Sequence, residues 1–457
     1  MGTLDQSPSS LAGASARAVA LDLMHRALEA VDPAARLREQ VRRAGNVLLV
    51  GDRAYDLDEF GSVYVLGAGK ATYAMAVALE GVLGDRLTDG FIVVKHGQVT
   101  SLRDRFGPVR RCRFAEAGHP VPDKHSLDAG REVLRMAQLV TGRDLVICLM
   151  TGGISALCVA PVDGVPFDDK LRLYELLVHS GADTTEMMTV RGHLSKLKAG
   201  GLLHALPPCT VVGLCVSDER HDDIRWCATW TMGDGSTQAD AVRILREYRL
   251  WDKVAPSVRQ ALGAPAAAAR SLPRAENRMI IRTRDLWPPI AHAATKMGLR
   301  PVLLTTVLSG ESRYAGSVIA SVAVQAALSG QPVAPPCVLV ALGETTVRVD
   351  DPGRGHGGPN QELAVGASLV LADCDGSARM ALCAVDTDGT DGPTDVAGAI
   401  VDPGSVRRAR EMGVDLQLAM RDHSTTHALL SAGDAIVLGH TGTNTNDLVL
   451  AVVLDRA

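Results

Sequence analysis

Residues 62–76 read SVYVLGAGKATYAMA, and this stretch decides the fold class. The apolar residues up to Leu66 predict a short buried strand, because the run is brief and rich in β-branched and aromatic side chains. The segment Gly67-Ala68-Gly69-Lys70 predicts a tight turn, and the residues after it have the spacing of a helix. A strand, a glycine turn and a helix in this order are typical of a parallel α/β layer.

The same alternation recurs through the rest of the chain. It predicts an α/β fold with two α/β/α domains and mostly parallel, Rossmann-like sheets. Helices are expected within 14–45 and over 126–139, 168–204, 312–329 and 360–372. Strands are expected over 91–94, 144–150, 210–219, 300–307 and 337–345, and within 380–392 and 434–442.

The length of 457 residues predicts at least two domains, because single cores stop growing at about 250–300 residues. Residues 263–277, GAPAAAARSLPRAEN, have no amphipathic period and contain two prolines, so we expect them to connect the domains. The predicted domains are therefore residues 1–275 and 276–457.

Composition argues against several partners. The net charge is only −5 with no basic block, and aromatic residues make up 3%, so nucleic acid is not expected to bind. No apolar run is long enough to span a membrane, and the N-terminus has no basic region of a signal peptide, which predicts a cytoplasmic protein. The nine cysteines form no CxxC or Cys/His cluster, so we expect buried thiols.

Two glycine loops follow predicted strands, where open parallel sheets bind ligands. The loop at Gly67, Gly69 and Lys70 could hold a phosphate through main-chain N–H groups and the lysine charge, or it could be a structural turn. It fails as a dinucleotide fingerprint, because Thr72 stands where the last glycine of GxGxxG belongs. The loop TGGISA at 151–156 offers Gly152, Gly153 and Ser155 for the same purpose, with a tight turn as the alternative.

The second half carries two glycine-rich or acidic loops. The four glycines in GRGHGGPNQE at 353–362 cost backbone entropy that a plain connection does not require, so we expect a function there. The loop DTDGTDGPTD at 386–395 places four carboxylates in ten residues, which is typical of a metal site, and oxygen ligands favour Mg²⁺. It is not an EF-hand, because it follows a strand and lacks the closing glutamate.

Other polar residues have both a functional and a structural interpretation. Asp218 and Glu344 end predicted strands and could bind substrate or metal. Arg191 lies on a predicted helix where a solvated basic face is at least as plausible. The loop 439–447 contains Asn444, and its alternative is an Asn/Thr-rich turn before the last strand.

Taken in order, these loops resemble the glycerate 2-kinase family, whose C-terminal half is the MOFRL domain. The resemblance covers nearly the whole chain and rests on seven segments, which are LGAGKA at 66–71, EAGHPVPD at 116–123, TVRGHLSKLKAGGL at 189–202, GETT at 343–346, GGPNQEL at 357–363, DGTDGPTDVAGAIVD at 388–402 and HTGTNTNDL at 440–448. It implies two α/β domains facing a cleft, and Mg²⁺-dependent transfer of the ATP γ-phosphoryl group to the 2-hydroxyl of D-glycerate.

The resemblance also assigns expected roles. Lys70 matches the active-site lysine of the family, and Asp386 and Asp388 are the expected catalytic acids and Mg²⁺ ligands. The expected partners are ATP, Mg²⁺ and a small hydroxylated substrate, and a homodimer is left open. The remaining residues expected to bind substrate or nucleotide are Gly67, Gly69, Gly152, Gly153, Ser155, Arg191, Asp218, Glu344, Asn360, Asp391 and Asn444.

Four loops depart from the family pattern. Pro359 stands where the family usually has the arginine of GGRNQE, which removes a charge expected to hold a carboxylate. Trp230 replaces a small loop residue, Ile154 replaces a glycine of SGGGS, and residues 281–284 read IRTR in place of GSNR. We therefore expect a glycerate-kinase-like phosphotransferase that acts on D-glycerate or on another small hydroxy acid, with Arg220, Arg225, Arg282 or Arg284 as a relocated anion clamp.

Two further classes stay open on the sequence. One is a catalytically impaired relative that binds a nucleotide or metabolite, and the other is a nicotinamide oxidoreductase. Loss of turnover in a Lys70→Ala protein would separate the kinase from the binding protein, and a spectral change with NAD(P)H would indicate the oxidoreductase.

Overall fold

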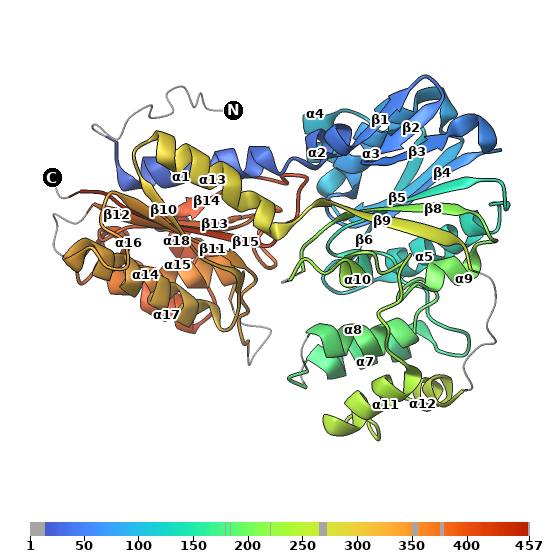
Figure 1. Ribbon diagram of the computed structural model, residues 1–457. Helices are drawn as coiled ribbons and strands as arrows, with labels where there is room; N and C mark the ends of the chain where they lie inside the picture. Colours follow the sequence, from blue (N-terminus) through green and yellow to red (C-terminus); the bar gives the residue numbers. More distant parts are fainter. Residues whose placement is uncertain are drawn as a thin grey trace. The chain divides into compact units, whose positions relative to one another are not determined.

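The protein forms two compact units in a computed structural model that describes residues 14–178, 180–182, 184–219, 221–264, 272–349, 355–374 and 379–455. Pro33–Ser217 and Asp223–Ile281 make up one unit, which we call the parallel-sheet unit. The other, the mixed-sheet unit, consists of the described residues of Met1–Asp32, Asp218–Asp222 and Arg282–Ala457. Figure 1 shows the elements of both units.

The parallel-sheet unit is built on six strands that all run in one direction. Their cores are continuous apolar runs, as expected for strands buried on both faces. The sequence-based prediction of a parallel α/β sheet is confirmed here. The strand order is β6 (Cys112–Ala117), β5 (Asp89–Lys95), β4 (Val63–Ala68), β7 (Leu145–Met150), β8 (Thr210–Val216) and β9 (Arg274–Ile281).

Helices cover both faces of this sheet (Figure 1). On one face α3 (Thr72–Leu83) contacts β5 and β7, and on the other α5 (Lys124–Ala137) packs on β5 and β6. The smaller elements of this unit are α2 (Pro33–Gln40), α4 (Gln98–Phe106), α6 (Ile154–Leu157), α9 (Gly201–Ala205), α10 (Ile224–Cys227), the 3-10 turns η1 (Leu57–Glu59) and η2 (Gly84–Arg86), and an antiparallel sheet of β1 (Val41–Ala44), β2 (Val47–Val50) and β3 (Arg53–Asp56).

A helical layer with its own apolar core completes the parallel-sheet unit. It contains α7 (Phe167–Val178), α8 (Thr184–His193), α11 (Gln238–Glu247) and α12 (Pro256–Gly263). The helical stretch predicted over 168–204 corresponds to three separate helices, α7, α8 and α9. Apolar residues of α7 and α8 face α11 and α12 and form this core.

The mixed-sheet unit also has six strands, but its sheet is mostly antiparallel. Among the described strands of this sheet, only β10 (Arg300–Leu308) and β11 (Cys337–Gly343) pair in parallel. The last strand, β15 (Asp447–Val453), lies between β11 and β12 (Met380–Asp386) and runs against both. The α/β class is confirmed, while a mostly parallel sheet in this half is corrected. The sheet ends with β13 (Gly398–Val401) and β14 (Ala435–Ile436), the short strand found within 434–442.

Two groups of helices cover the mixed sheet (Figure 1). On one face α1 (Ala16–Ala30) and α13 (Trp287–Lys296) pack together, and α1 contacts β12 and β15. On the other face α14 (Ser312–Ser329) packs tightly against α15 (Pro359–Leu371). Glycine at position 316 permits this close approach, since a Cβ there would collide with the Leu363 carbonyl. The remaining elements are η3 (Thr283–Leu286), α16 (Ser405–Glu411), α17 (Leu416–Arg421) and α18 (Thr425–Ala432).

The contact-based units are not contiguous along the chain. The described residues up to Asp32 and those of the segment Asp218–Asp222 belong with the mixed sheet. The connection expected over 263–277 is wrong in its last residues, because Arg274 begins β9, whereas 265–271 lies outside the described residues. The proposed domain boundary at residue 275 stays a prediction.

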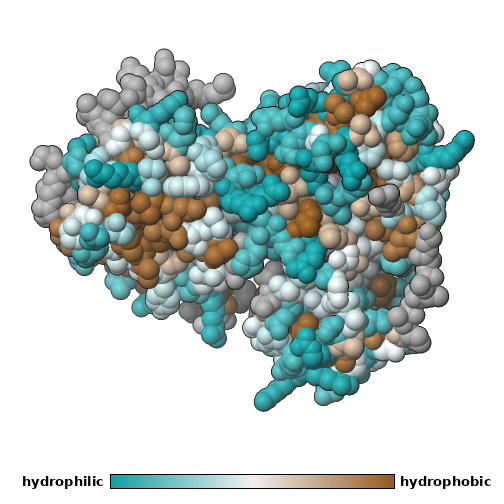
Figure 2. All heavy atoms as spheres, in the orientation of Figure 1, coloured by the Kyte–Doolittle hydropathy of each residue, from teal (hydrophilic) through white to brown (hydrophobic). Residues whose placement is uncertain are grey.

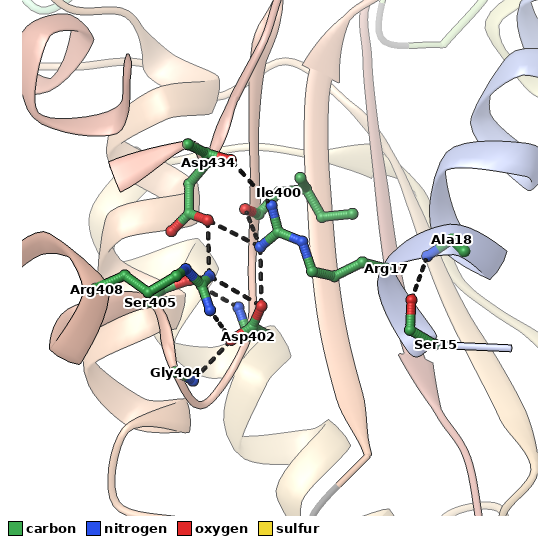
Figure 3. Close-up of polar contacts among 10 residues, drawn as sticks. Ser15, Arg17, Ala18, Ile400, Asp402, Gly404, Ser405, Arg408 and Asp434 are labelled. Atoms are coloured by element: carbon green, nitrogen blue, oxygen red, sulfur yellow. Dashed lines mark hydrogen bonds and ion pairs between the residues drawn. The ribbon is translucent and has the colours of Figure 1, made fainter. Parts of the chain in front are cut away.

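A network of charged side chains ties α1 to the mixed sheet (Figure 3). Arg17 Nη1 donates to Asp402 Oδ2 and Asp434 Oδ1, both at 2.9 Å, and to the carbonyl oxygen of Ile400 at 3.1 Å. Arg408 donates to the same two carboxylates. The Asp434 side chain is fully buried, so its charge depends on these two guanidinium groups.

Replacing Arg17 by methionine is expected to lower the unfolding free energy of the mixed-sheet unit by about 1–3 kcal/mol, because it removes one of two cations from a buried carboxylate. Urea unfolding measures the loss. The matched control is Arg407→Met, since Arg407 pairs with Glu411 on an exposed helix surface where such pairs contribute less than about 1 kcal/mol. Equal midpoints for the two variants would contradict this account.

The surface of the mixed-sheet unit carries exposed apolar side chains on α14 and on the edge strand β10. Tyr314, Val318 and Leu328 of α14 are each more than 60% exposed, at 68%, 63% and 67%. Figure 2 shows hydrophobic residues grouped over the part of this unit where β10 and α14 lie. Among the described residues, no helix combines the length and apolar character needed to cross a membrane.

Candidate functional site

The two predicted phosphate loops of the parallel-sheet unit lie side by side. They follow β4 and β7, which are neighbouring parallel strands, so both loops emerge at the carboxyl edge of the sheet. The Lys70 N–H donates to the Gly152 carbonyl oxygen at 2.9 Å, and the Ala71 N–H donates to Thr151 Oγ1 at 3.1 Å. Two segments that are 80 residues apart in sequence therefore form one polar surface.

Glycine is required at both loops for steric reasons. Gly69 has a φ of 132°, and a Cβ at this position would collide with Thr151. Gly153 has a φ of 86°, in the left-handed region, directly before α6. A Cβ on Gly67 would also press on Thr72 and Leu149. The close approach of the backbones explains why the sequence places small residues here.

Lys70 and Ser155 are the partly exposed polar side chains of this surface. Gly67, Gly69 and Gly152 are buried, and Gly153 is partly exposed. The arrangement gives a cation and a hydroxyl beside a tightly turned backbone, which is a combination suited to an anionic oxygen. The predicted residues of these two loops are thus brought together.

Arg191 lies elsewhere in the parallel-sheet unit, on α8 in the helical layer. Its guanidinium stacks on the Tyr174 ring, with Cζ 4.3 Å from the ring centroid. Burial lowers the pKa of Arg191 and lowers that of the neighbouring fully buried Lys170 well below its usual value. The solvated basic face considered for Arg191 is therefore wrong, and a ligand role for this residue stays a prediction.

The mixed-sheet unit gathers carboxyl groups at one edge of its sheet. Glu344 follows the end of β11, Asp386 ends β12, and Asp447 begins β15 between them. In the strand register, Asp447 lies opposite both Gly343 and Asp386. Sequence reasoning missed Asp447, although it closes the polar loop 439–447; its position between two carboxylate-bearing strands depends on the insertion of β15.

Asn360 links two of these acids. Its Nδ2 donates to Asp447 Oδ1 at 2.7 Å and to Asp391 Oδ1 at 3.3 Å, and its N–H donates to Asp391 Oδ1 at 3.0 Å. The Gln361 N–H donates to the other oxygen of Asp391 at 2.9 Å. Asp391 therefore lies at the N-terminus of α15, where helix N–H groups stabilise negative charge. The predicted pair Asn360 and Asp391 is brought together.

Burial raises the pKa values of two carboxyl groups at this edge of the mixed sheet. Burial raises the pKa of Asp391 to about 6 against the opposing effect of the hydrogen bonds from Asn360 and Gln361. Burial, together with the negative charges of Glu344 and Asp391, raises the pKa of Asp447 well above its usual value. Both groups therefore gain stability from a proton or a nearby cation.

The acidic loop has an ordered local structure. Asp386 Oδ1 accepts from the Asp388 N–H at 2.9 Å, and Asp388 Oδ1 accepts from the Thr390 N–H and hydroxyl at 2.7 and 2.8 Å. The hard oxygen donors of this edge match the preference of Mg²⁺, and Asn360 Oδ1 is a buried acceptor without a hydrogen-bond partner among the described residues. The donor types therefore match the preference of a magnesium ion, although no three carboxylates of this edge have ligand atoms within 4.8 Å of one another among the described residues.

Another contact joins two predicted residues, Asp218 and Asn444, that are far apart in sequence. Asn444 Nδ2 donates to Asp218 Oδ2 at 3.2 Å, within the mixed-sheet unit. In the same region, Asn446 Nδ2 donates to Thr283 Oγ1 at 3.2 Å. The short segment Asp218–Asp222 thus brings the residues after β8 to the loop before β15.

The positions that depart from the family pattern have distinct structural settings. Pro359 is the first residue of α15, where the missing N–H removes no helical hydrogen bond. The side chains of Trp230 and Ile154 belong to the apolar core of the parallel-sheet unit, although the loop that carries Ile154 contributes Ser155 to the polar surface. Trp230 is fully buried, which leaves no surface for contact with substrate.

The proposed relocated arginines are differently engaged. Arg225 pairs with its neighbour Asp223, with Nη2 at 2.5 Å from Oδ2, so its charge is already offset. Arg284 is exposed and lies 4.0 Å from Asp222. Arg220 lies outside the described residues.

The mixed-sheet unit should be more stable at low pH than at high pH, because the carboxyl groups of Asp391 and Asp447 keep protons in the folded state that the unfolded chain has released. In chelator-treated protein, the unfolding free energy of the mixed-sheet unit should fall as pH rises from about 4 to 8. Asp447→Asn cannot ionise, so its stability relative to the wild type should rise between pH 5 and pH 8 by about 1–3 kcal/mol.

Urea unfolding at the two pH values measures this difference. Asp373→Asn is the matched control, because it neutralises an exposed carboxylate of the same unit. A relative stability of Asp447→Asn that is unchanged between pH 5 and pH 8 would contradict the account.

Comparisons with known proteins agree with the family resemblance that the loops indicated. Residues 19–263 match the family described as domain of unknown function DUF4147, and residues 337–447 match the MOFRL family. The chain is similar to the glycerate 2-kinase of Pyrococcus horikoshii, with 36% identity over 96% of this chain and 98% of that protein. It is also similar to the D-glycerate 2-kinase of Thermotoga maritima, with 33% identity over 96% and 99% of the two chains.

A solved structure supports the same relationship. The crystal structure of a glycerate kinase from Thermotoga maritima matches with a TM-score of 0.76 and 32% identity, over 95% of this chain and 99% of that chain. The fold and these matches define a kinase-like protein built from a DUF4147 segment and a MOFRL segment. The chain belongs to the glycerate 2-kinase family.

Proposed function

We propose that this protein is a phosphotransferase that moves the γ-phosphoryl group of ATP to a hydroxyl of a small hydroxy acid. D-Glycerate is the first candidate, because the relatives from Pyrococcus horikoshii and Thermotoga maritima are named as kinases of glycerate. The observation that supports the proposal is the contact between the Lys70 and Gly152 loops, which joins two predicted segments into one polar surface. Two relatives from Agrobacterium vitis, 35% and 36% identical to this chain, are named putative hydroxypyruvate reductases, but the loop at 67–72 lacks the last glycine of the GxGxxG fingerprint that a nicotinamide cofactor would require.

In this proposal the parallel-sheet unit binds anionic oxygens of the substrate or nucleotide. Lys70 would neutralise charge on the substrate or on the transferring group, and Ser155 would donate a hydrogen bond from the neighbouring loop. Phosphoryl transfer requires positioning and charge stabilisation more than covalent participation of the protein. A lysine beside tightly turned backbone is suited to this task.

The carboxyl edge of the mixed-sheet unit would hold magnesium. Asp386 and Asp388 are the proposed ligands, and Glu344 and Asp447 lie at the same edge. Bound magnesium would supply positive charge to phosphate oxygens. Asn360 would keep Asp447 and Asp391 in place through its hydrogen bonds, and Asp218 with Asn444 would form a polar contact on the same unit.

Two further expectations remain proposals. We place the enzyme in the cytoplasm on the sequence argument, and we expect neither nucleic acid nor membrane as a partner. A homodimer would cover the exposed apolar side chains of β10 and α14, such as Tyr314 and Leu328.

The Lys70→Ala protein should release ADP from ATP, Mg²⁺ and D-glycerate at least about 100-fold more slowly than the wild type, because it lacks the positive charge at the reacting group. A coupled ADP assay measures the rate, and circular dichroism verifies the fold. Lys253→Ala is the matched control, because Lys253 is exposed in the same unit and lies outside the loops.

This assay distinguishes an active kinase from a catalytically impaired binding protein. Turnover that survives unchanged in Lys70→Ala would contradict the role of this lysine. Absence of turnover in the wild type with every hydroxy acid tested, while ATP still binds, would instead support the catalytically impaired binding protein.

Restoring the family arginine with Pro359→Arg should raise kcat/KM for D-glycerate by about tenfold or more, mainly through a lower KM, because a guanidinium can hold the carboxylate. Position 359 begins α15, which tolerates residues other than proline at its first position. Steady-state kinetics with the matched variant Pro359→Gln separates the charge from the loss of proline. An equal gain in both variants would contradict the clamp.

A further inference from the structure

Two histidines and an aspartate form a compact group at the carboxyl edge of the parallel sheet. They are His96, Asp123 and His125, and their ligand atoms all lie within 4.8 Å of one another. Among the described residues, this is the one group of three or more His, Cys, Asp or Glu side chains with such spacing. None of the three belongs to the expected catalytic or magnesium residues.

Secondary structure holds each member in place. His96 follows β5, and its N–H donates to the carbonyl oxygen of Ala117 at the end of β6. Asp123 is the N-cap of α5, where its Oδ1 accepts from the N–H and the hydroxyl of Ser126 at 2.9 and 3.1 Å. His125 lies in the first turn of the same helix. The group therefore stands on a fixed frame.

The free oxygen of the cap points at one imidazole. Asp123 Oδ2 lies 2.7 Å from His96 Nε2, with Oδ1 committed to the helix cap. The His125 ring stands at 86° to the His96 ring, with centroids 5.3 Å apart. A plain ion pair between His96 and Asp123 would not require this second imidazole.

We propose that His96, Asp123 and His125 bind one divalent transition-metal ion, of which Zn²⁺ is the representative. Two imidazole nitrogens and one carboxylate oxygen are the donor set that zinc, cobalt and nickel prefer, whereas magnesium prefers oxygen ligands alone. Tetrahedral ligands at about 2.0–2.2 Å from zinc lie about 3.3 Å apart, so small side-chain rotations from the present spacing suffice.

The charge and exposure of the group fit such an ion. The negative charge of Asp123 offsets the positive end of the α5 helix dipole, which would otherwise disfavour a cation. His96 and His125 are exposed, so an ion can enter from solvent without opening of the fold. Three protein ligands leave a fourth position for a water or for an oxygen of an anionic ligand.

The test uses the full-length chain without an affinity tag, freed of metal by a chelator and titrated with Zn²⁺ in a calorimeter in the presence of excess Mg²⁺. We expect one high-affinity ion per chain, with binding at least tenfold weaker in His96→Ala and in His125→Ala. The control His292→Ala removes an exposed histidine outside the group and should bind as the wild type does.

A second measurement uses Co²⁺, whose visible absorption reports nitrogen and oxygen ligands in a low-symmetry site. The absorption should appear with the wild type and be lost in His125→Ala, while circular dichroism shows that the variant remains folded. Absence of zinc binding, displacement of zinc by Mg²⁺, or equal zinc binding in His125→Ala and the wild type would overturn the proposal. None of these readings depends on kinase activity.

Discussion

Desolvation of carboxyl groups dominates the site in the mixed-sheet unit. Burial alone would make the ionised forms of Asp391 and Asp447 unfavourable, and their raised pKa values reflect this cost. The surrounding structure reduces the cost through the Asn360 amide and the Thr345 N–H, which bind Asp447, and through the N–H groups that begin α15. A bound cation would reduce the cost further, so the edge is suited to hold magnesium beside phosphate oxygens.

The two units use different means for related tasks. The parallel sheet brings two glycine turns together because neighbouring strands end at the same level, and Gly69 permits the close approach of Thr151. The mixed sheet instead collects side-chain carboxylates by placing the start of β15 between the ends of β11 and β12. One surface offers the positive charge of Lys70 and the hydroxyl of Ser155, and the other offers acidic oxygens; a phosphotransferase needs both kinds of group.

Local sequence patterns predicted individual helices and strands, but they failed where the fold depends on pairing between strands that are far apart in the chain. The pattern of strand, glycine turn and helix around Lys70 was sufficient for the β4–α3 unit, and α14 spans its predicted residues 312–329. The antiparallel insertion of β15 could not be predicted, because apolar runs do not reveal their partners. Asp447 was missed for the same reason. The burial of Trp230 depends on tertiary packing, which no local pattern reports.

Phosphorus NMR of the protein with ATP, Mg²⁺ and D-glycerate observes the transferred phosphoryl group itself. For a glycerate 2-kinase, the γ-phosphate signal of ATP should decrease while a phosphomonoester signal appears, coupled to the proton on carbon 2 of glycerate. The appearance of inorganic phosphate alone, or an unchanged ATP spectrum under conditions where ATP is bound, would contradict phosphoryl transfer to this acceptor.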